Sequence, residues 1–183
     1  MENDSNIYSS KAILFDRDGI VNVRLIGDYV KNIKEFSFIP EFLEAFKIIC
    51  KKGYKTFLIT NQQGVGKGLM SESDLEVIHS FMQDELQKLT GFKFDGIYYC
   101  TDLANSGSKR RKPEPGMIYE AIEENKLSKE DLWFIGDSLT DVEAGVKAGI
   151  KTLLLSEKES DPRFIPTRKS PKLSDMIDLA KSL

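Results

Sequence analysis

Short apolar runs alternate along the chain with segments whose apolar residues recur at helical spacing. Five runs with β-branched and aromatic residues span residues 12–15, 55–60, 94–99, 132–135 and 151–155. Such runs, apolar on both faces, are typical of parallel strands buried between helices. The pattern therefore predicts five strands of one parallel sheet.

The segments between these runs predict helices. Their apolar stripes span residues 42–49, 75–89, 117–122, 142–148 and 173–179. Ser71 is a good N-cap for the second helix, and Gly91 follows its last apolar residue. Gly53 and Gly149 end the first and the fourth helix in the same way. The alternation predicts a Rossmann-like, doubly wound α/β sheet in a three-layer α/β/α arrangement, with ligands bound at the carboxyl ends of the strands.

Length and charge narrow the function classes. A chain of 183 residues predicts one domain, with a core over about 11–156 and a tail with a helix over about 157–183. Lys and Arg number 26 against 29 Asp and Glu, and this net charge of −3 argues against broad nucleic-acid binding. No apolar stretch approaches the ~20 residues of a membrane span, and the polar residues 1–10 do not resemble a signal sequence. Two cysteines, Cys50 and Cys100, favour a reducing compartment, so we expect a cytoplasmic protein.

Polar side chains follow three of the predicted strands. The turns after these strands read Asp-Arg-Asp-Gly at 16–19, Thr-Asn-Gln-Gln at 60–63 and Gly-Asp-Ser at 136–138. Any one of them can be an ordinary strand-exit turn, but three such turns should meet at one edge of the sheet. Clustered carboxylates repel one another unless a cation lies between them, and hard oxygen ligands favour Mg²⁺. The sequence therefore predicts a magnesium site at this edge.

Four motifs in this order resemble those of the haloacid dehalogenase-like phosphatases. They are FDRDG at 15–19, Thr-Asn at 60–61, Arg-Lys-Pro at 111–113 and GDSLTD at 136–141. The resemblance runs from Ala12 to Leu155. It is closest to the branch of heptose-bisphosphate and histidinol phosphatases, through the segments NQQGVGKG, FDGIYYC, RKPEPGM and GDSLTDVEAGVKAG.

The resemblance implies a phosphomonoesterase that forms an aspartyl-phosphate. Asp16 would be the nucleophile, and Asp18 the general acid and then the general base. Mg²⁺ would be held by Asp16, by the backbone carbonyl of Asp18 and by Asp137. The metal-bound Asp16 would stay ionised while Asp18 holds a proton. Thr60 and the backbone amide of Asn61 would bind the transferring phosphoryl group.

Further residues receive supporting roles from the same resemblance. Lys112 would supply positive charge to the phosphoryl group, and Arg111 would help to position the substrate. Gln62 and Arg110 are substrate-binding candidates, although Arg110 can equally belong to a solvated basic face of 109–112. Asp141 would support the metal or Lys112; its alternative role is that of an acid at a helix N-terminus. Ser138 would be a further supporting residue.

The chain departs from the branch at two positions. The heptose-bisphosphate branch commonly carries a four-ligand zinc loop, of which only Cys100 is present here, so we expect no zinc and a buried thiol. Ser138 stands where that branch often has Lys. Gly64–Gly68 lacks the spacing of a Walker loop, and we interpret it as a loop beside the phosphate site in which Lys67 touches substrate. The single histidine, His79, is interpreted as a surface or packing residue.

The segments between the predicted strands are too short for a cap domain. The loops 24–29, 62–68 and 102–111 should therefore select the substrate. We expect a small sugar phosphate, a heptose bisphosphate above all, with histidinol phosphate or another small phosphomonoester as the alternative. The chain should be a monomer or a small homo-oligomer without a membrane partner.

Two other function classes fit the sequence less well. A receiver-like signalling domain is disfavoured because the third strand ends in Tyr98-Tyr99-Cys100, without an Asp at its tip. An inactive scaffold is disfavoured because no acid of the four motifs is missing.

Overall fold

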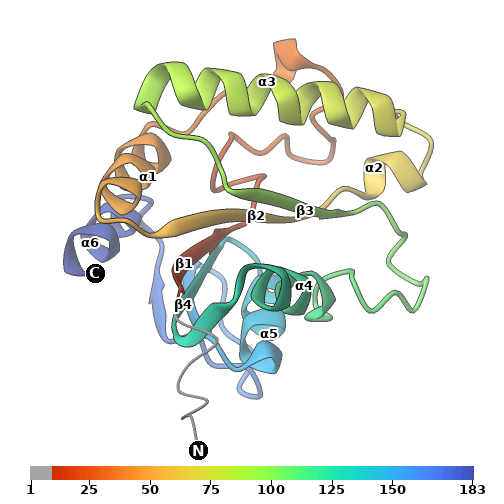
Figure 1. Cartoon of the computed structure of the whole chain (residues 1–183). Helices are drawn as coiled ribbons and strands as arrows, with labels where there is room; N and C mark the ends of the chain where they lie inside the picture. Colours follow the sequence, from red (N-terminus) through yellow and green to blue (C-terminus); the bar gives the residue numbers. More distant parts are fainter. Residues whose placement is uncertain (1–9) are drawn as a thin grey trace, which may run out of the picture.

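Six parallel strands form one sheet within residues 10–183, the part of the chain that the computed structural model describes. They are β1 (Ser10–Phe15), β2 (Lys55–Asn61), β3 (Gly96–Cys100), β4 (Leu127–Gly136), β5 (Lys151–Leu155) and β6 (Arg168–Ser170). Their order across the sheet is β3-β2-β1-β4-β5-β6 (Figure 1). The chain winds from the centre to one edge and then from the centre to the other, so the predicted doubly wound fold is confirmed.

Helices cover both faces of the sheet (Figure 1). They are α1 (Pro40–Lys51), α2 (Gln63–Gly66), α3 (Glu72–Thr90), α4 (Gly116–Asn125), α5 (Leu139–Ala148) and α6 (Asp175–Ser182), with a 3₁₀ turn, η1, at Ile33–Glu35. Alternate residues of β1 point to opposite faces. Ile13 and Phe15 belong to the core shared with α1, α3 and α6, whereas Ala12 and Leu14 belong to the core shared with α4 and α5. Burial on both faces explains why β1 is apolar from Ala12 to Phe15.

Local signals placed the longest helix correctly. The Ser71 side chain accepts a hydrogen bond from the Asp74 amide, and the Asp74 carboxylate accepts one from the Ser71 amide. This reciprocal capping satisfies two backbone donors that the first turn of a helix leaves free. At the other end Gly91 has a φ of 86°, a left-handed conformation that glycine adopts without strain.

Three features differ from the expected elements. Strand β6 was not predicted, because its Arg-Lys-Ser sequence has no apolar run and it is held by backbone pairing with β5. Strand β4 begins at Leu127, five residues before the expected start. Its first residue pairs with Ser10 of β1, and the register shifts between this pair and the next one, Ala12 with Leu132. The segment 62–68, expected to be a loop, contains the short helix α2. The tail thus adds a strand to the sheet and a helix that packs against α1 (Figure 1).

The connections between strands are short. Only η1 and α1 lie between β1 and β2, and a loop leads from β3 to α4. None of the helices within residues 10–183 combines the length and apolar character that crossing a bilayer requires. Residues 1–9, for which we expected no signal sequence, lie outside the described part of the chain.

Candidate active site

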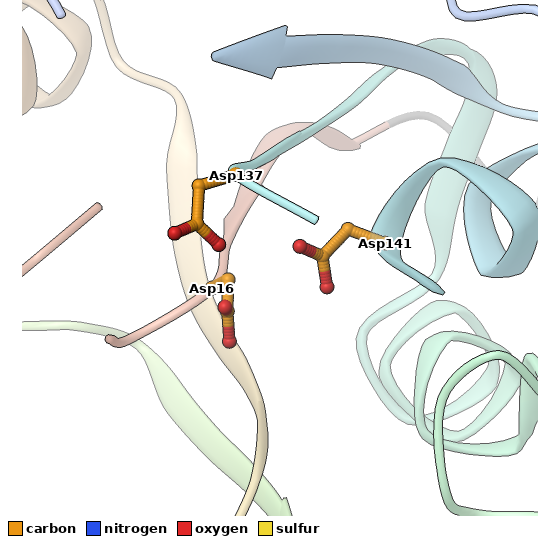
Figure 2. Close-up of side chains that lie close together, drawn as sticks. All are labelled: Asp16, Asp137 and Asp141. Atoms are coloured by element: carbon orange, nitrogen blue, oxygen red, sulfur yellow. The ribbon is translucent and has the colours of Figure 1, made fainter. Parts of the chain in front are cut away.

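Three carboxylates meet where β1 and β4 end. Asp16 directly follows β1, Asp137 follows β4, and Asp141 lies in the first turn of α5. One oxygen from each lies within 4.8 Å of the others, and Figure 2 shows the three side chains facing a common space. Burial, with a contribution from the neighbouring carboxylates, raises the pKa of Asp16 to about 6 and that of Asp137 to about 7, although Lys112 and Arg24 act in the opposite direction. The cluster therefore favours either protons or a cation.

Glycines allow this close approach. A Cβ atom at Gly19, which has a φ of 98°, would lie 2.1 Å from Asp137 Oδ2. A Cβ atom at Gly136 would lie 2.4 Å from Asp141 Oδ2. Neither distance is possible for a real side chain, so both glycines are required where the chain brings its carboxylates together.

Lys112 lies at the base of the cluster with almost no exposed surface. Its Nζ is 2.8 Å from Asp16 Oδ1, 2.7 Å from Asp141 Oδ1 and 2.8 Å from the carbonyl oxygen of Ile59. Burial lowers the pKa of Lys112, but the two carboxylates outweigh this effect and hold it above its usual value. Lys112 is thus a permanent cation beside Asp16, as its predicted role requires.

The backbone of Lys112 is fixed by Asn61, at the end of β2. The Asn61 side-chain amide donates to the Lys112 carbonyl at 2.9 Å, and its oxygen accepts from the Lys112 amide at 3.1 Å. This two-way contact joins segments 51 residues apart in the sequence. Asn61 therefore positions Lys112 through its side chain, a role that the sequence did not suggest.

Asp141 holds Lys112 and also caps its own helix. Its Oδ2 accepts hydrogen bonds from the Ser138 amide at 3.0 Å and from the Ser138 hydroxyl at 2.6 Å. Its other oxygen, Oδ1, is left to Lys112. Asp141 therefore contacts Lys112 and also lies at the N-terminus of α5, the two positions that its alternative interpretations require, and Ser138 orients the carboxylate.

The side chain of Asp18 has different neighbours. Arg17 contacts both of its oxygens at 3.0–3.1 Å, Asn22 donates to Oδ1 at 3.0 Å, and Gln62 donates to Oδ2 at 2.8 Å. Burial raises the pKa of Asp18, but these donors, Arg17 first, hold it below its usual value. The protein's own groups thus favour a proton on Asp16 over one on Asp18, the reverse of the order expected for the metal-bound site.

Thr60 and Gln62 are both buried beside Asp18. The Gln62 side-chain amide donates to Thr60 Oγ1 at 2.8 Å as well as to Asp18. Gln62, which we expected to bind substrate, is 1% exposed and contacts the protein instead. Thr60 is the next-to-last residue of β2, and the Gln62 amide links its hydroxyl to Asp18.

Arg24 was expected only as part of a substrate loop, yet it lies against the carboxylate cluster. Its Nη2 is 2.8 Å from Asp137 Oδ1, 2.9 Å from the Asp18 carbonyl oxygen and 3.9 Å from Asp16 Oδ2. These three groups are the predicted ligands of Mg²⁺. The positive guanidinium of Arg24 lies against all three of them. All the atoms that would bind a metal are oxygens, so these residues fit a hard divalent cation.

A cavity of about 470 Å³ adjoins the cluster at Asp18 and Arg24, and two of the three predicted loops, 24–29 and 62–68, line it. Tyr29 connects two of them, because its hydroxyl accepts hydrogen bonds from Gln63 at 2.8 Å and Lys67 at 3.0 Å. Arg111 connects the third, with contacts to Gln63 Oε1 at 3.3 Å and to the Asp102 carbonyl at 2.9 Å. The cavity has a size typical of sites for small metabolites.

Comparison with known proteins decides the family. A family model described as haloacid dehalogenase-like hydrolase matches residues 15–155, most of the chain. This chain is a haloacid dehalogenase-like hydrolase.

Individual relatives and a solved structure agree with this assignment. The D-glycero-beta-D-manno-heptose-1,7-bisphosphate 7-phosphatase of Helicobacter pylori is 37% identical over 96% of this chain and 99% of its own length. The alpha-anomer 7-phosphatase of Campylobacter jejuni is also 37% identical, over 82% of this chain and 84% of its own. The D,D-heptose 1,7-bisphosphate phosphatase from B. bronchiseptica, complexed with magnesium and phosphate, has a TM-score of 0.83 at 28% identity and covers 94% of this chain and 99% of its own. The predicted class, a phosphoric monoester hydrolase, is confirmed.

In this haloacid dehalogenase-like hydrolase, hydrogen bonds connect the two ends of the loop that begins with Cys100, the one residue retained from the zinc loop of the heptose-bisphosphate branch. The Cys100 thiol lies 3.4 Å from Asp102 Oδ2 and 3.8 Å from Ser108 Oγ. Arg110 forms two hydrogen bonds with the Glu120 carboxylate at 2.7 and 2.9 Å. The structure therefore holds Arg110 on α4, and does not bring it to the carboxylate cluster with the other candidates.

His79 is buried on α3 rather than at the surface. Its ring lies against Tyr99, and its Nε2 is 3.4 Å from Nη1 of Arg17. Burial, together with the Arg17 charge, lowers the pKa of His79 to about 3. A neutral histidine thus packs behind the arginine that holds Asp18. No local pattern predicts this contact, because 62 residues separate the two side chains.

Proposed function

We propose that this chain is a Mg²⁺-dependent phosphatase that removes the 7-phosphate from a heptose 1,7-bisphosphate. The observation that supports it most is the single group formed by Asp16, Asp137, Asp141 and Lys112 beside a cavity with basic side chains. The relatives named above supply the substrate class, and both anomers occur among them.

The chain's own residues divide the work of the first step. Asp16, Asp137 and the Asp18 carbonyl would hold Mg²⁺, which when bound neutralises phosphate charge and lowers the pKa of Asp16. Lys112 keeps positive charge 2.8 Å from the same carboxylate. Both effects favour the ionised Asp16 that attacks phosphorus to form the aspartyl-phosphate.

Asp18 would carry the proton. As general acid it gives a proton to the leaving sugar oxygen, and as general base it then takes one from the water that hydrolyses the aspartyl-phosphate. Arg17, Asn22 and Gln62 keep the pKa of Asp18 low without substrate. A phosphate dianion next to Asp18 raises that pKa, so we infer that the proton is acquired as the substrate binds.

The cavity favours a substrate with a second negative group. Arg24 and Lys67 line it, and Arg111 contacts Gln63 in its wall. Asp28, the other acid besides Asp18 in the lining, is paired with Lys31. A second phosphate complements these cations, whereas the ammonium and imidazole groups of histidinol phosphate do not.

The test is phosphate release in the presence of Mg²⁺ from three substrates: the heptose 1,7-bisphosphate, the 7-phosphate without a 1-phosphate, and histidinol phosphate. We expect kcat/KM to be about 100-fold higher for the bisphosphate than for the other two substrates. Two basic side chains of the cavity would make charge-assisted contacts with its 1-phosphate, which the other substrates lack. Phosphorus NMR should identify the 1-phosphate as the product. Release of the 1-phosphate, or faster turnover of histidinol phosphate, would contradict the proposal.

Lys67→Met tests whether the cavity binds the second phosphate. Lys67 contacts Tyr29 and none of the carboxylates in the cluster. Its loss should lower kcat/KM for the bisphosphate by about tenfold and leave the 7-phosphate unaffected. An equal loss for both substrates would mean that Lys67 does not meet the second phosphate.

We also propose that the enzyme needs no zinc and acts in the cytoplasm, as a monomer or small homo-oligomer. Both cysteines are free thiols, which fits a reducing compartment. Metal analysis of the purified protein tests the first part, and stoichiometric zinc would overturn our interpretation of the Cys100 loop.

A further inference from the structure

Arg24 contacts the same oxygens that a bound divalent cation would use. Its Nη2 bridges Asp137 Oδ1 and the Asp18 carbonyl at 2.8 and 2.9 Å, and its Nε also faces that carbonyl at 3.2 Å. Mg²⁺ binds oxygens at about 2.0–2.1 Å. A divalent cation held by these oxygens would therefore compete with the Arg24 guanidinium for them, and its charge would repel the guanidinium.

The two cations of the cluster differ in their freedom to leave. Lys112 is 3% exposed and has three acceptors, so it has no route away from Asp16. The Arg24 side chain is 43% exposed. Only the cation on the open side can be exchanged.

The Arg24 side chain can leave the carboxylates while its backbone stays in place. Val23, just before it, is held by a hydrogen bond from its amide to the Ser37 carbonyl. The loop 24–29 that follows lines the substrate cavity, and Arg24 lines both that cavity and the smaller hollow over Asp16 and Lys112. A rotation about its side-chain bonds therefore moves the guanidinium from the carboxylates into the cavity without moving the sheet.

We propose that Arg24 is an exchangeable counter-cation. It neutralises Asp137 and Asp16 while no metal is bound, competes with the divalent cation for them, and moves into the substrate cavity when the cation enters. This inference rests on the cation site of the proposed function. It adds that metal loading delivers a positive charge to the place where an anionic substrate binds.

Direct metal binding tests the exchange. Protein freed of metal with a chelator is titrated with MgCl₂ in a calorimeter, as wild type, Arg24→Met, Arg24→Lys and Lys67→Met. We expect Arg24→Met to bind Mg²⁺ about tenfold more tightly, because the ion no longer displaces a charged hydrogen-bonded group. Arg24→Lys, which keeps the charge without the planar fork, should fall between the two. Lys67→Met removes a charge from the same cavity and should leave the affinity within about twofold, since the charge is screened and makes no contact with the ligands.

Thermal unfolding gives an independent readout. Metal-free Arg24→Met should melt at a lower temperature than the wild type, and Mg²⁺ should raise its melting temperature by a larger increment. Unchanged or weaker Mg²⁺ binding by Arg24→Met, or equal tightening by Lys67→Met, would overturn the inference. If wild-type phosphate release stays intact in that case, the proposed function survives. Failure of every variant to bind Mg²⁺ would overturn both.

Discussion

Asp16 and Asp18 are two residues apart, yet the fold gives them opposite surroundings. Asp16 shares a buried space with two other acids, and burial raises its pKa to about 6. Asp18 faces Arg17, Asn22 and Gln62, which hold its pKa below the usual value although burial acts in the other direction. The difference teaches that two identical side chains receive their properties from their partners, Lys112 from a distant segment for Asp16, and the adjacent Arg17 together with Asn22 and the more distant Gln62 for Asp18.

The largest expected effect separates the two carboxylates directly. Asp16→Asn should abolish turnover, because an amide cannot form the aspartyl-phosphate. Asp18→Asn should lower kcat by about 10²–10⁴, the usual value of one proton-transfer group, and should keep the affinity for Mg²⁺. Phosphate release and Mg²⁺ calorimetry measure the two effects, with far-UV circular dichroism to verify folding. Residual turnover by Asp16→Asn above the Asp18→Asn rate would reverse the assignment.

Removal of Lys112 should show how much its charge stabilises the folded protein with Asp16 buried. Lys112→Met leaves Asp16 and Asp141 buried without their shared partner, which should lower the free energy of unfolding by about 3–5 kcal/mol near pH 8. The loss should shrink near pH 5, since Asp16 has a raised pKa and takes up a proton there. Urea unfolding at both pH values measures it.

Lys147→Met is the matched control for this loss. Lys147 also has two carboxylate partners, Glu114 and Glu143, but all three side chains are partly exposed. Its removal should cost under about 1 kcal/mol. Equal losses in the two variants would mean that burial does not distinguish Lys112.

Much of this site follows from local sequence. Parallel strands end at one edge of a sheet, so the apolar runs before Asp16, Thr60 and Asp137 were enough to bring these residues together. Ser71 and Gly91 fixed the ends of α3 because capping depends on neighbouring residues only. Strand β6 could not be predicted in this way, because its three polar residues have no strand pattern of their own and form a strand only by backbone pairing with the edge of β5.

The partners of the carboxylates could not be predicted in the same way. Gln62 and Arg110 both stood beside motif residues, yet Gln62 turns inward to Asp18 and Arg110 outward to Glu120. Side-chain direction at the end of a strand depends on packing from other elements, which a single sequence does not specify. Arg24 and His79 belong to the same class, as their contacts join segments 62 or more residues apart.

His79 extends the comparison to the support behind Asp18. Its folded-state pKa of about 3 lies below the usual 6.5, so between these values the unfolded chain binds a proton that the folded one does not. Stability therefore falls as the pH drops below 6.5, by about 2 kcal/mol at pH 5 from this residue. His79→Gln keeps a neutral acceptor near Arg17 and should remove this part of the acid-side loss in urea unfolding. A wild-type profile unchanged by the substitution would mean that His79 is protonated in the folded protein.

The smallest effect concerns one hydrogen bond to Asp18. Gln62→Leu removes the 2.8 Å donor to Oδ2 and leaves Arg17 and Asn22 in place. Because the carboxylate is then less firmly oriented and its pKa rises, kcat should fall by about tenfold while KM stays nearly constant. The acid limb of the kcat profile should move to higher pH, since the base step needs Asp18 ionised.

The neighbouring Gln63 makes this prediction specific to Asp18. Gln63 contacts Tyr29 and Arg111 in the wall of the cavity and does not reach the carboxylates. Gln63→Leu should therefore raise KM for the bisphosphate and leave kcat and its pH profile unchanged. Steady-state kinetics of both variants across the pH range would separate a residue that orients the proton carrier from one that shapes the substrate cavity. The same change in kcat for both would mean that the loop, rather than the Gln62 contact, controls Asp18.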